Sequence, residues 1–554
     1  MSNSLMAAVS GLQGHQKMLD VAGNNLANVN SYGFKSSRVT FAELLAETIQ
    51  EGTQPGSGVG GTNPKQIGSG MTVATIDRDI SQGTLVQTGQ ALDMAIEGAG
   101  FFVLSDGQKD VYTRVGRFSV DSDYYLVDSS TGYRVQRLGT VGVTEGFQDP
   151  GNDSIRIPYD LALPAQATEN MSFTGNLSAD NEAPTTNEMS GGIQYTEDGA
   201  LAAQETLLAD LDQASGISDG ETITVSGKDA DGTDINTTFT IGTGPGQDGE
   251  TLGDLVDFIS AAYSGATARL SNGEIRLRDD AAGYSQSDLY TTYNGAGTFE
   301  LPYFFRHLTA GGGEAKTANL EIFDTLGIGH VISAAFVRTD TANTWDMVVT
   351  DVTGDVSFDG FDDRRIRGIE FNPDGSFAGT GGAVPDSQTV TLRFGGPGAT
   401  QWTVNVDLGT VGQFDGLSQF GGGSTVAAAG QDGYEAGYLS SLAVSREGTV
   451  SGMFTNGVRR DIAALQIATF QNPAGLLNAG QAYYETSANS GDPRVATALA
   501  GGAGAINAGA LERSNVDTAE EFVNLIQAQN GFQANARTIT VTNDMLRELS
   551  NLIR

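Results

Sequence analysis

The sequence of 554 residues contains no cysteine, only 13 prolines and only two tryptophans. Without cysteine, the chain can form no disulfide, thiolate metal site or cysteine nucleophile. Basic residues are also scarce, because 30 lysines and arginines stand against 67 acidic residues, for a net charge of −37. A surface that binds nucleic acid needs clustered positive charge, so the composition argues against nucleic acid as a partner.

Long apolar runs are missing as well. The longest uncharged stretch near the C-terminus, residues 495–511, consists mainly of glycine and alanine, and it predicts a linker rather than a membrane span. Residues 1–20 have no basic leading segment, and polar residues interrupt their apolar stretch. We therefore expect no membrane insertion and no cleaved signal peptide.

Glycine is abundant, with 75 residues, and threonine, valine and tyrosine are frequent in the middle of the chain, which favours β-structure with tight turns. The charge is distributed unevenly. Residues 1–30 carry one lysine and one aspartate, and residues 517–554 carry five acids and three arginines. Two almost neutral ends on an acidic body predict that the ends associate while the body faces water.

Both ends show an apolar repeat of seven residues. The first predicts a helix over residues 1–30 that closes among the asparagines of residues 24–28, since asparagine tolerates the left-handed conformation. The second follows a capping box formed by Asp517 and Glu520, and it predicts a helix over residues 517–554. Either helix alone is explained by packing on an ordinary core, but the matching periods favour a coiled-coil pairing. The repeats are Leu5, Leu12, Leu19 and Leu26, and Leu525, Phe532, Ile539, Leu546 and Ile553.

The middle of the chain predicts several domains. Residues 52–70 are rich in glycine and predict a loop or an extended arm, and alternating stretches such as 318–350 and 388–407 predict half-buried strands. Residues 205–290 have an αββαββ pattern that could bury a small core of its own. The predicted fold is therefore multidomain α+β, with paired N- and C-terminal coiled-coil helices, several β-rich domains nested outward and a small inserted α/β module.

The expected boundaries follow from these changes in pattern. They are a core helix over 1–30, a connecting arm over 31–70, an inner β domain over 71–150 and 431–500, an outer β domain over 151–204 and 291–430, the inserted module over 205–290, a linker over 501–516 and a second core helix over 517–554.

No set of residues predicts chemistry. The histidines at 15, 307 and 330 do not have the spacing of a zinc site. Residues 56–61 match G-x-G-x-x-G, but they follow no strand and open no helix. The runs 229–232 and 359–363 could hold calcium, although Asp-Gly is also the usual hairpin turn. We expect no catalytic residue, cofactor or metal, and hence no enzyme.

Several motifs at the two ends resemble the signatures of the flagellar rod and hook protein family. They lie at residues 11–12, 19–21, 23–28, 32–35 and 89–102, and at 514–517 and 530–537. Residues 324–327, 431–437, 452–457 and 470–476 resemble hook proteins more than rod proteins. The signature residues are Asn24, Asn25, Asn28, Gly33, Phe34, Asn530, Gly531 and Phe532.

The resemblance implies a structural subunit that polymerises into a flexible tube, the hook, and transmits torque from the motor and rod to the filament. It implies paired terminal helices in the core of the tube, with the seven-residue rows as assembly interface. It also implies export without a cleaved signal, a location outside the cell, and contacts with rod, hook-cap, hook–filament junction and export proteins. The alternatives are a distal rod protein or, in another class, an acidic calcium-stabilised surface adhesin.

Overall fold

The structure, a computed structural model, describes residues 3–180, 183–358, 360–381, 388–395 and 399–552. Among these residues it is mostly β-strand, with three α-helices, α1 (Asn3–Ala27), α2 (Leu252–Ala262) and α3 (Thr518–Leu552). The chain divides into two compact units. Unit 1 consists of Met1–Leu163 and Gly437–Arg554, and unit 2 is the intervening Pro164–Ala436.

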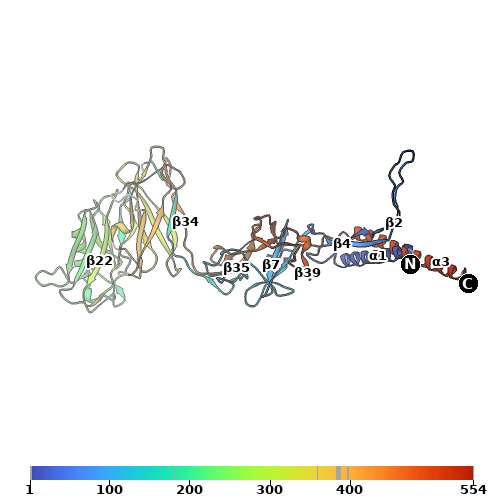
Figure 1. Ribbon diagram of the computed structural model, residues 1–554. Helices are drawn as coiled ribbons and strands as arrows, with labels where there is room; N and C mark the ends of the chain where they lie inside the picture. Colours follow the sequence, from blue (N-terminus) through green and yellow to red (C-terminus); the bar gives the residue numbers. More distant parts are fainter. Residues whose placement is uncertain (1–2, 181–182, 359, 382–387, 396–398, 553–554) are drawn as a thin grey trace. The chain divides into compact units, whose positions relative to one another are not determined.

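The two terminal helices of unit 1 confirm the helices expected at the chain ends. Figure 1 shows α1 and α3 side by side, with α3 extending beyond the N-terminus of α1. The side chain of Asp517 accepts hydrogen bonds from the amides of Ala519 (2.8 Å) and Glu520 (3.3 Å) at the start of α3. At the end of α1, the Asn28 side chain donates to the carbonyl of Asn24 (2.9 Å). Local side chains thus satisfy the free backbone groups at both helix ends.

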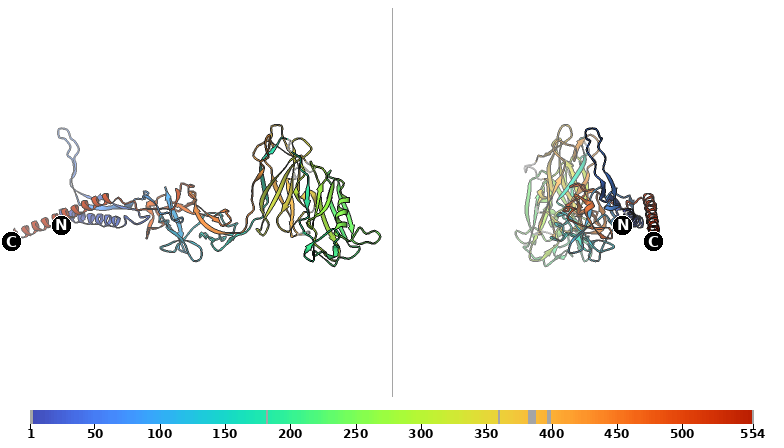
Figure 2. Two further views of the ribbon diagram at one scale, coloured as in Figure 1. Left: turned by 180° about the vertical axis from the view of Figure 1, so that it is seen from behind. Right: turned by 45° about the vertical axis from the view of Figure 1, so that its right-hand side comes forward.

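Four strands of unit 1 lie close to the helices. β1 and β4 pair antiparallel with an irregularity between Thr40 and Phe41, and β2 and β3 form a separate hairpin with residues 51–64 at its tip. This hairpin projects away from its neighbours in both views (Figures 1 and 2). The bounds are β1 Ser37–Glu43, β2 Ala46–Gln50, β3 Lys65–Gly68 and β4 Met71–Arg78.

The β body of unit 1 is built from both chain segments. A nine-stranded sheet joins strands that precede unit 2 to strands that follow it, and Phe101, Tyr112 and Tyr484 share its core. A second sheet has the order β12-β35-β36-β37. The bounds are β7 Phe101–Ser105, β8 Asp110–Thr113, β9 Phe118–Val120, β10 Leu126–Asp128, β11 Arg134–Val135, β12 Ala162–Leu163, β35 Gly437–Val444, β36 Thr449–Phe454, β37 Arg459–Ala464, β38 Ile467–Thr469, η3 Pro473–Gly475, β39 Leu477–Gly480, β40 Tyr483–Glu485 and β41 Arg494–Ala496.

Residues 501–516 correct one expectation, because they were expected to be a linker and instead contain two paired strands. β42 (Ala505–Ala508) pairs with β6 (Met94–Glu97), and β43 (Ala510–Glu512) pairs with β5 (Leu85–Gln87). Their small residues permit close approach: a Cβ on Gly504 would lie 3.0 Å from Gly98 Cα. Glycine and alanine give little strand signal in a sequence, although here they allow the chains to meet.

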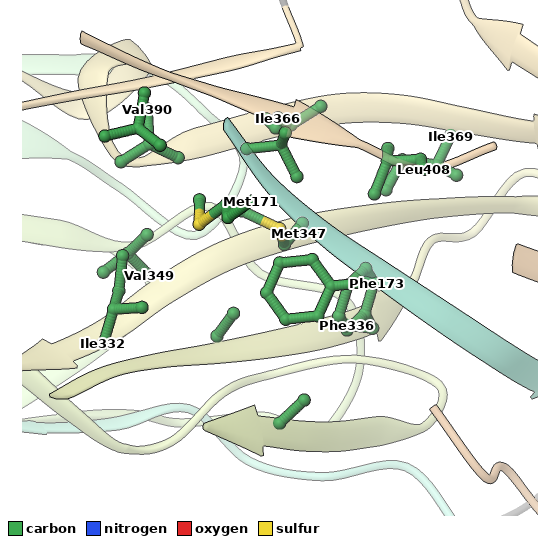
Figure 3. Packing of buried hydrophobic residues seen from close by; sticks show 14 of the residues in the cluster. Met171, Phe173, Ile332, Phe336, Met347, Val349, Ile366, Ile369, Val390 and Leu408 are labelled. Atoms are coloured by element: carbon green, nitrogen blue, oxygen red, sulfur yellow. The ribbon is translucent and has the colours of Figure 1, made fainter. Parts of the chain in front are cut away.

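Unit 2 contains two sheets around one large apolar core. One has the order β25-β26-β27-β29-β30, and the other β28-β31-β32-β13-β33 with β34 beside β13. Figure 3 shows this core, in which the rings of Phe173 and Phe336 pack together. Their ring centroids lie 5.4 Å apart. Trp345 is fully buried in it. The bounds are β13 Asn170–Ser178, β25 Ala315–Phe323, β26 Gly329–Arg338, β27 Thr344–Val352, β28 Val356–Ser357, η2 Phe361–Asp363, β29 Arg365–Phe371, β30 Phe377–Thr380, β31 Thr389–Phe394, β32 Gln401–Asp407, β33 Leu417–Phe420 and β34 Ala427–Gln431.

A second core in unit 2 surrounds α2. It contains the helices and strands expected within residues 205–290, and its buried residues extend on both sides of that range, from Met189 to Phe305. Thr251 and Asp254 form a capping box at the start of α2. The bounds are β14 Glu188–Ser190, β15 Thr196–Glu197, β16 Ala200–Leu201, η1 Leu208–Asp210, β17 Ala214–Ser215, β18 Thr222–Lys228, β19 Asp234–Thr240, β20 Ala266–Ser271, β21 Glu274–Asp279, β22 Asp288–Asn294, β23 Thr298–Phe299 and β24 Arg306–Thr309.

Candidate assembly surface

The line along which α1 and α3 meet is made of small and polar residues. Ala8 and Ala22 of α1 are buried, and Ala528 of α3 has no exposed surface. A Cβ on Gly11 would lie 2.7 Å from Asn535 Oδ1, and a Cβ on Gly531 would lie 2.5 Å from the ring of His15. Such distances leave no room for a larger side chain, so small residues allow the two backbones to approach closely.

The predicted apolar rows flank this contact line instead of forming it. In α3 the line follows Glu521, Ala528, Asn535 and Thr542, which also repeat every seven residues. The rows lie beside it at the same period. Leu5, Leu12, Leu19 and Leu26 are half-buried, as are Leu525, Phe532 and Ile539; Leu546 is 51% exposed, and Ile553 lies outside the described residues.

The helix pair leaves many large apolar side chains exposed. An open groove of about 630 Å³ runs along α3 between residues 530 and 545, with Ser4 of α1 at its side, and Val541 and Met545 line it. Several large apolar side chains left exposed on one pair of helices indicate an interaction site. The exposed apolar residues of the helices are Met6 and Val9 of α1, and Phe522, Val523, Ile526, Val541, Met545 and Leu546 of α3.

A polar junction fastens the helices where they meet the strands. Asn25 has no exposed surface, and its Nδ2 donates to Glu521 Oε1 (2.8 Å) and to the carbonyl of Ser37 (2.7 Å). Its Oδ1 accepts from the Ser37 amide (3.0 Å). One asparagine thus links the end of α1, the start of β1 and the first turn of α3. Its amide uses both donor hydrogens and its acceptor, as burial requires.

Asn515 makes a second set of links just before α3. Its Oδ1 accepts from the amide of Ser36 (2.8 Å), and its Nδ2 donates to the carbonyls of Asp79 (3.0 Å) and Ser81 (3.3 Å). The segments before β1, after β4 and before α3 are therefore held together at one point. None of these partners is a neighbour in sequence.

Three buried charges lie next to this junction. Lys35 Nζ donates to Glu512 Oε1 (2.6 Å) and to the carbonyl of Ser81 (2.7 Å), and both side chains of the pair are fully buried. Arg114 Nη1 lies 3.5 Å from Glu512 Oε2. Desolvation lowers the pKa of Lys35 below its usual range, although Glu512 opposes the shift. Desolvation likewise lowers the pKa of Arg114.

The predicted signature residues fall around this junction. Gly33 has a φ of 66° and its amide donates to the carbonyl of Glu512 (2.8 Å), and a Cβ there would lie 2.7 Å from Val115. Glycine is required on both counts. Phe34 is half-buried and Asn24 is exposed. Gly531 and Phe532 lie on α3, and Asn530 lines its groove.

Glu512 and Arg114 could not be recognised as functional residues from the sequence. Lys35 and Asn515 lay inside recognised motifs, but nothing in those motifs indicated distant partners such as Glu512, which is 477 residues from Lys35. The contact line at positions 521, 528, 535 and 542 was present as a second seven-residue period of small and polar residues. A search for regularly spaced small and polar residues, and not only large apolar ones, finds it.

The histidines and acidic turns have structural partners. Nδ1 of His330 lies 2.8 Å from the carbonyl of Thr353, and the ring packs on Phe394. Asp229 accepts from the amides of Ala230 (2.8 Å) and Ser264 (3.0 Å), as a turn residue does. Asp359 lies outside the described residues. Across the described ranges, no three acidic or histidine side chains gather as a metal site would require.

The described part of the chain also contains no helix with the length and apolarity needed to cross a membrane.

Comparisons with known proteins match both chain ends and the β-rich middle. The family models are a flagella basal body rod protein over residues 5–35, a flagellar hook protein FlgE/F/G D1 domain over 95–176, a flagellar basal body protein FlaE D2 domain over 299–434, and a flagellar basal body rod FlgEFG protein C-terminal domain over 507–552. The flagellar hook protein FlgE of Borreliella burgdorferi is 30% identical over 566 aligned positions that cover 100% of both chains. The chain belongs to the flagellar hook protein family.

A second relative agrees with this membership. The flagellar hook protein FlgE of Treponema pallidum is 31% identical over 558 positions, again with 100% of both chains covered. The crystal structure of the Helicobacter pylori flagellar hook protein FlgE2 matches with 17% identity and a TM-score of 0.37, over 76% of this chain and 99% of that one.

Family membership places the junction in the parts that hook proteins share. Asn25, Gly33 and Lys35 lie in the first matched range, and Glu512 and Asn515 lie in the last. The chain is a structural subunit of the flagellar hook, a family that is structural and not enzymatic, and it is part of the flagellum. The hook reading is thus favoured over the distal rod and adhesin alternatives.

Proposed function

We propose that the hook subunit polymerises through its helix pair, which forms the core of a tube. On this proposal α1 and α3 pair as a coiled coil along their small-residue line, and the two flanking apolar rows contact neighbouring copies. The β-rich domains lie outside this helical core, with the boundaries expected from the sequence except that residues 501–516 contain two paired strands. The polymer is then a flexible tube, which can bend while it transmits torque from rod to filament.

The observation that carries this proposal is the apolar surface left on the helix pair. Val541 and Met545 are 50% and 58% exposed beside a groove in α3, although the chain as a whole carries a net charge of −37. Burying each of these side chains between copies contributes about 1.5–3 kcal/mol. A helix of a neighbouring copy, itself apolar on the matching rows, is the occupant that fits.

The β2–β3 hairpin is proposed as a second contact. Its side chains are exposed along nearly its whole length, including Leu45, which is 89% exposed, and Ile49 and Ile67. An isolated two-stranded hairpin is marginally stable at best in water. We therefore expect the hairpin to rest on a neighbouring copy in the tube.

The remaining parts of the proposal rest on family membership. They are export through the flagellar apparatus without a cleaved signal, a location outside the cell, and contacts with rod, hook-cap and hook–filament junction proteins. The polymer itself requires no cofactor, metal or nucleic acid.

The test compares two aspartates on the same helix. Val541→Asp places a charge in the proposed interface, whereas Gln529→Asp places one at an exposed, polar position of α3 that does not line the groove. Burying an unpaired carboxylate between copies costs several kcal/mol per subunit. We expect the first variant to be secreted without forming hooks and the second to form them, as seen by electron microscopy. Normal hooks from Val541→Asp contradict the proposal.

A further inference from the structure

The buried charges of Lys35, Glu512 and Arg114 lie where both chain ends leave the strands for the helices. Lys35 comes eight residues after α1 ends at Ala27, and Glu512, at the end of β43, comes six residues before α3 begins at Thr518. Glu512 Oε1 also accepts from the Gly83 amide (2.8 Å), in the connection between β4 and β5. The pair therefore ties both helices to the strands beside them.

Lys35 and Arg114 have different attachments. Lys35 belongs to the N-terminal segment and bonds to Glu512 and to the carbonyl of Ser81. Arg114 belongs to the β body, where its guanidinium lies 5.1 Å from the centre of the Phe101 ring and donates to the carbonyl of Ile96 (3.4 Å). Of the two cations, only Lys35 lies on the helix side of the junction, where the Gly33 amide also donates to the Glu512 carbonyl (2.8 Å).

The cluster contains two cations and one carboxylate. Removing either cation leaves one buried ion pair, so the two removals are matched in charge and in burial. A buried ion pair is seldom more stabilising than apolar residues of the same volume, but it restricts the geometry in which its partners can meet. Here the ion pair fixes how the segments that carry its partners are oriented to one another.

We propose that Lys35 is a positioning residue, which holds the helix pair in one orientation to the β body through its buried contacts with Glu512 and Ser81. In the hook, a consequence that rests on the proposed function, this fixed angle limits how far each subunit bends at the junction. Lys35 therefore contributes to the stiffness of the tube rather than to the cohesion between copies.

The first measurement uses the free subunit. The chain has no cysteine, so Gln16→Cys on α1 and Ser122→Cys in the β body, both exposed, give two unique sites for spin labels. We expect pulsed electron paramagnetic resonance to show one narrow distance distribution. Lys35→Met should broaden it at least twofold, whereas Arg114→Met should leave it narrow. Equal widths for Lys35→Met and Arg114→Met overturn the proposal, as does a broad distribution for the unsubstituted chain.

The second measurement uses assembled hooks. Electron micrographs should show that the persistence length of Lys35→Met hooks falls at least twofold, while Arg114→Met hooks keep it. Equal persistence lengths overturn the role in stiffness. Because the spin-label experiment needs no polymer, a failure of the helix pair to form the tube is distinguishable from a failure of Lys35 to position it. If Lys35→Met alone unfolds the β body, seen as lost far-ultraviolet circular dichroism, the residue is structural and the proposal fails.

Discussion

The stability of unit 2 should fall as the pH is lowered, because one buried histidine must stay neutral. His307 Nδ1 lies 2.7 Å from Asn187 Oδ1, and its Nε2 lies 2.8 Å from Arg364 Nη2. Since arginine only donates, Nε2 must accept and Nδ1 must carry the proton. Desolvation first, and then the charges of Arg364 and Arg365, hold the pKa of His307 well below its usual range.

The magnitude follows from proton linkage. In the unfolded chain His307 takes up a proton as the pH falls through about 6.5, but in the folded chain it does not. Lower pH therefore favours the unfolded state, and this histidine removes about 1.4 kcal/mol of unfolding free energy per pH unit below about 6.5. The loss continues until the pH reaches the lowered pKa of the folded state.

The two tryptophans provide the assay. Trp345 and Trp402 both lie in unit 2, so urea unfolding of the full chain followed by tryptophan fluorescence reports on that unit alone. His307→Gln is the control, because its amide oxygen can accept from Arg364 and does not titrate. We expect the unfolding free energy of the chain to fall relative to that of the variant as the pH is lowered below about 6.5, by at most about 1.4 kcal/mol per pH unit. Parallel pH profiles over this interval would refute the reasoning.

Three further predictions concern the helix pair and the buried ion pairs. Ile539→Asp should abolish hook formation in electron micrographs while fluorescence shows unit 2 still folded; hooks of normal length would show that its row does not face a neighbour. Limited trypsin digestion should cut first after exposed Arg547 and spare buried Lys35, as mass spectrometry of the fragments can check. Asp288→Ala should lower the unfolding free energy of unit 2 by about 3–5 kcal/mol, since Arg364 loses its buried carboxylate; an unchanged urea midpoint would contradict this.

The sequence predicted those parts of the fold whose signals are local. The terminal helices carry a seven-residue period and end in side chains that bond their own backbone, such as Asp517 and Asn28. The helix α2 belongs to the αββαββ pattern that was predicted for residues 205–290. The strands expected over residues 318–350 and 388–407 alternate visibly because one side faces the large core of unit 2.

The junction could not be predicted because its partners are far apart in sequence. Glu521 is an example: an acid in the first turn of a helix is expected to be exposed and to interact with the helix dipole. Here it is only 9% exposed, since the side chain of Asn25 covers it. Lys35 and Glu512 give no local sign of burial either. Charged residues are read as surface residues unless their partner is known.

The two seven-residue lines of α3 indicate how one helix serves two kinds of contact. The line through Ala528 and Asn535 meets α1 of the same chain, and its small residues permit an approach too close for leucine. The line through Phe532 and Ile539 lies beside it and continues to Leu546, which is 51% exposed. The helix pair is therefore complete as an intramolecular contact but leaves an apolar row that α1 does not fully cover. On the proposed function, neighbouring copies cover this row, and assembly then stabilises a helix pair that has already formed in the free subunit.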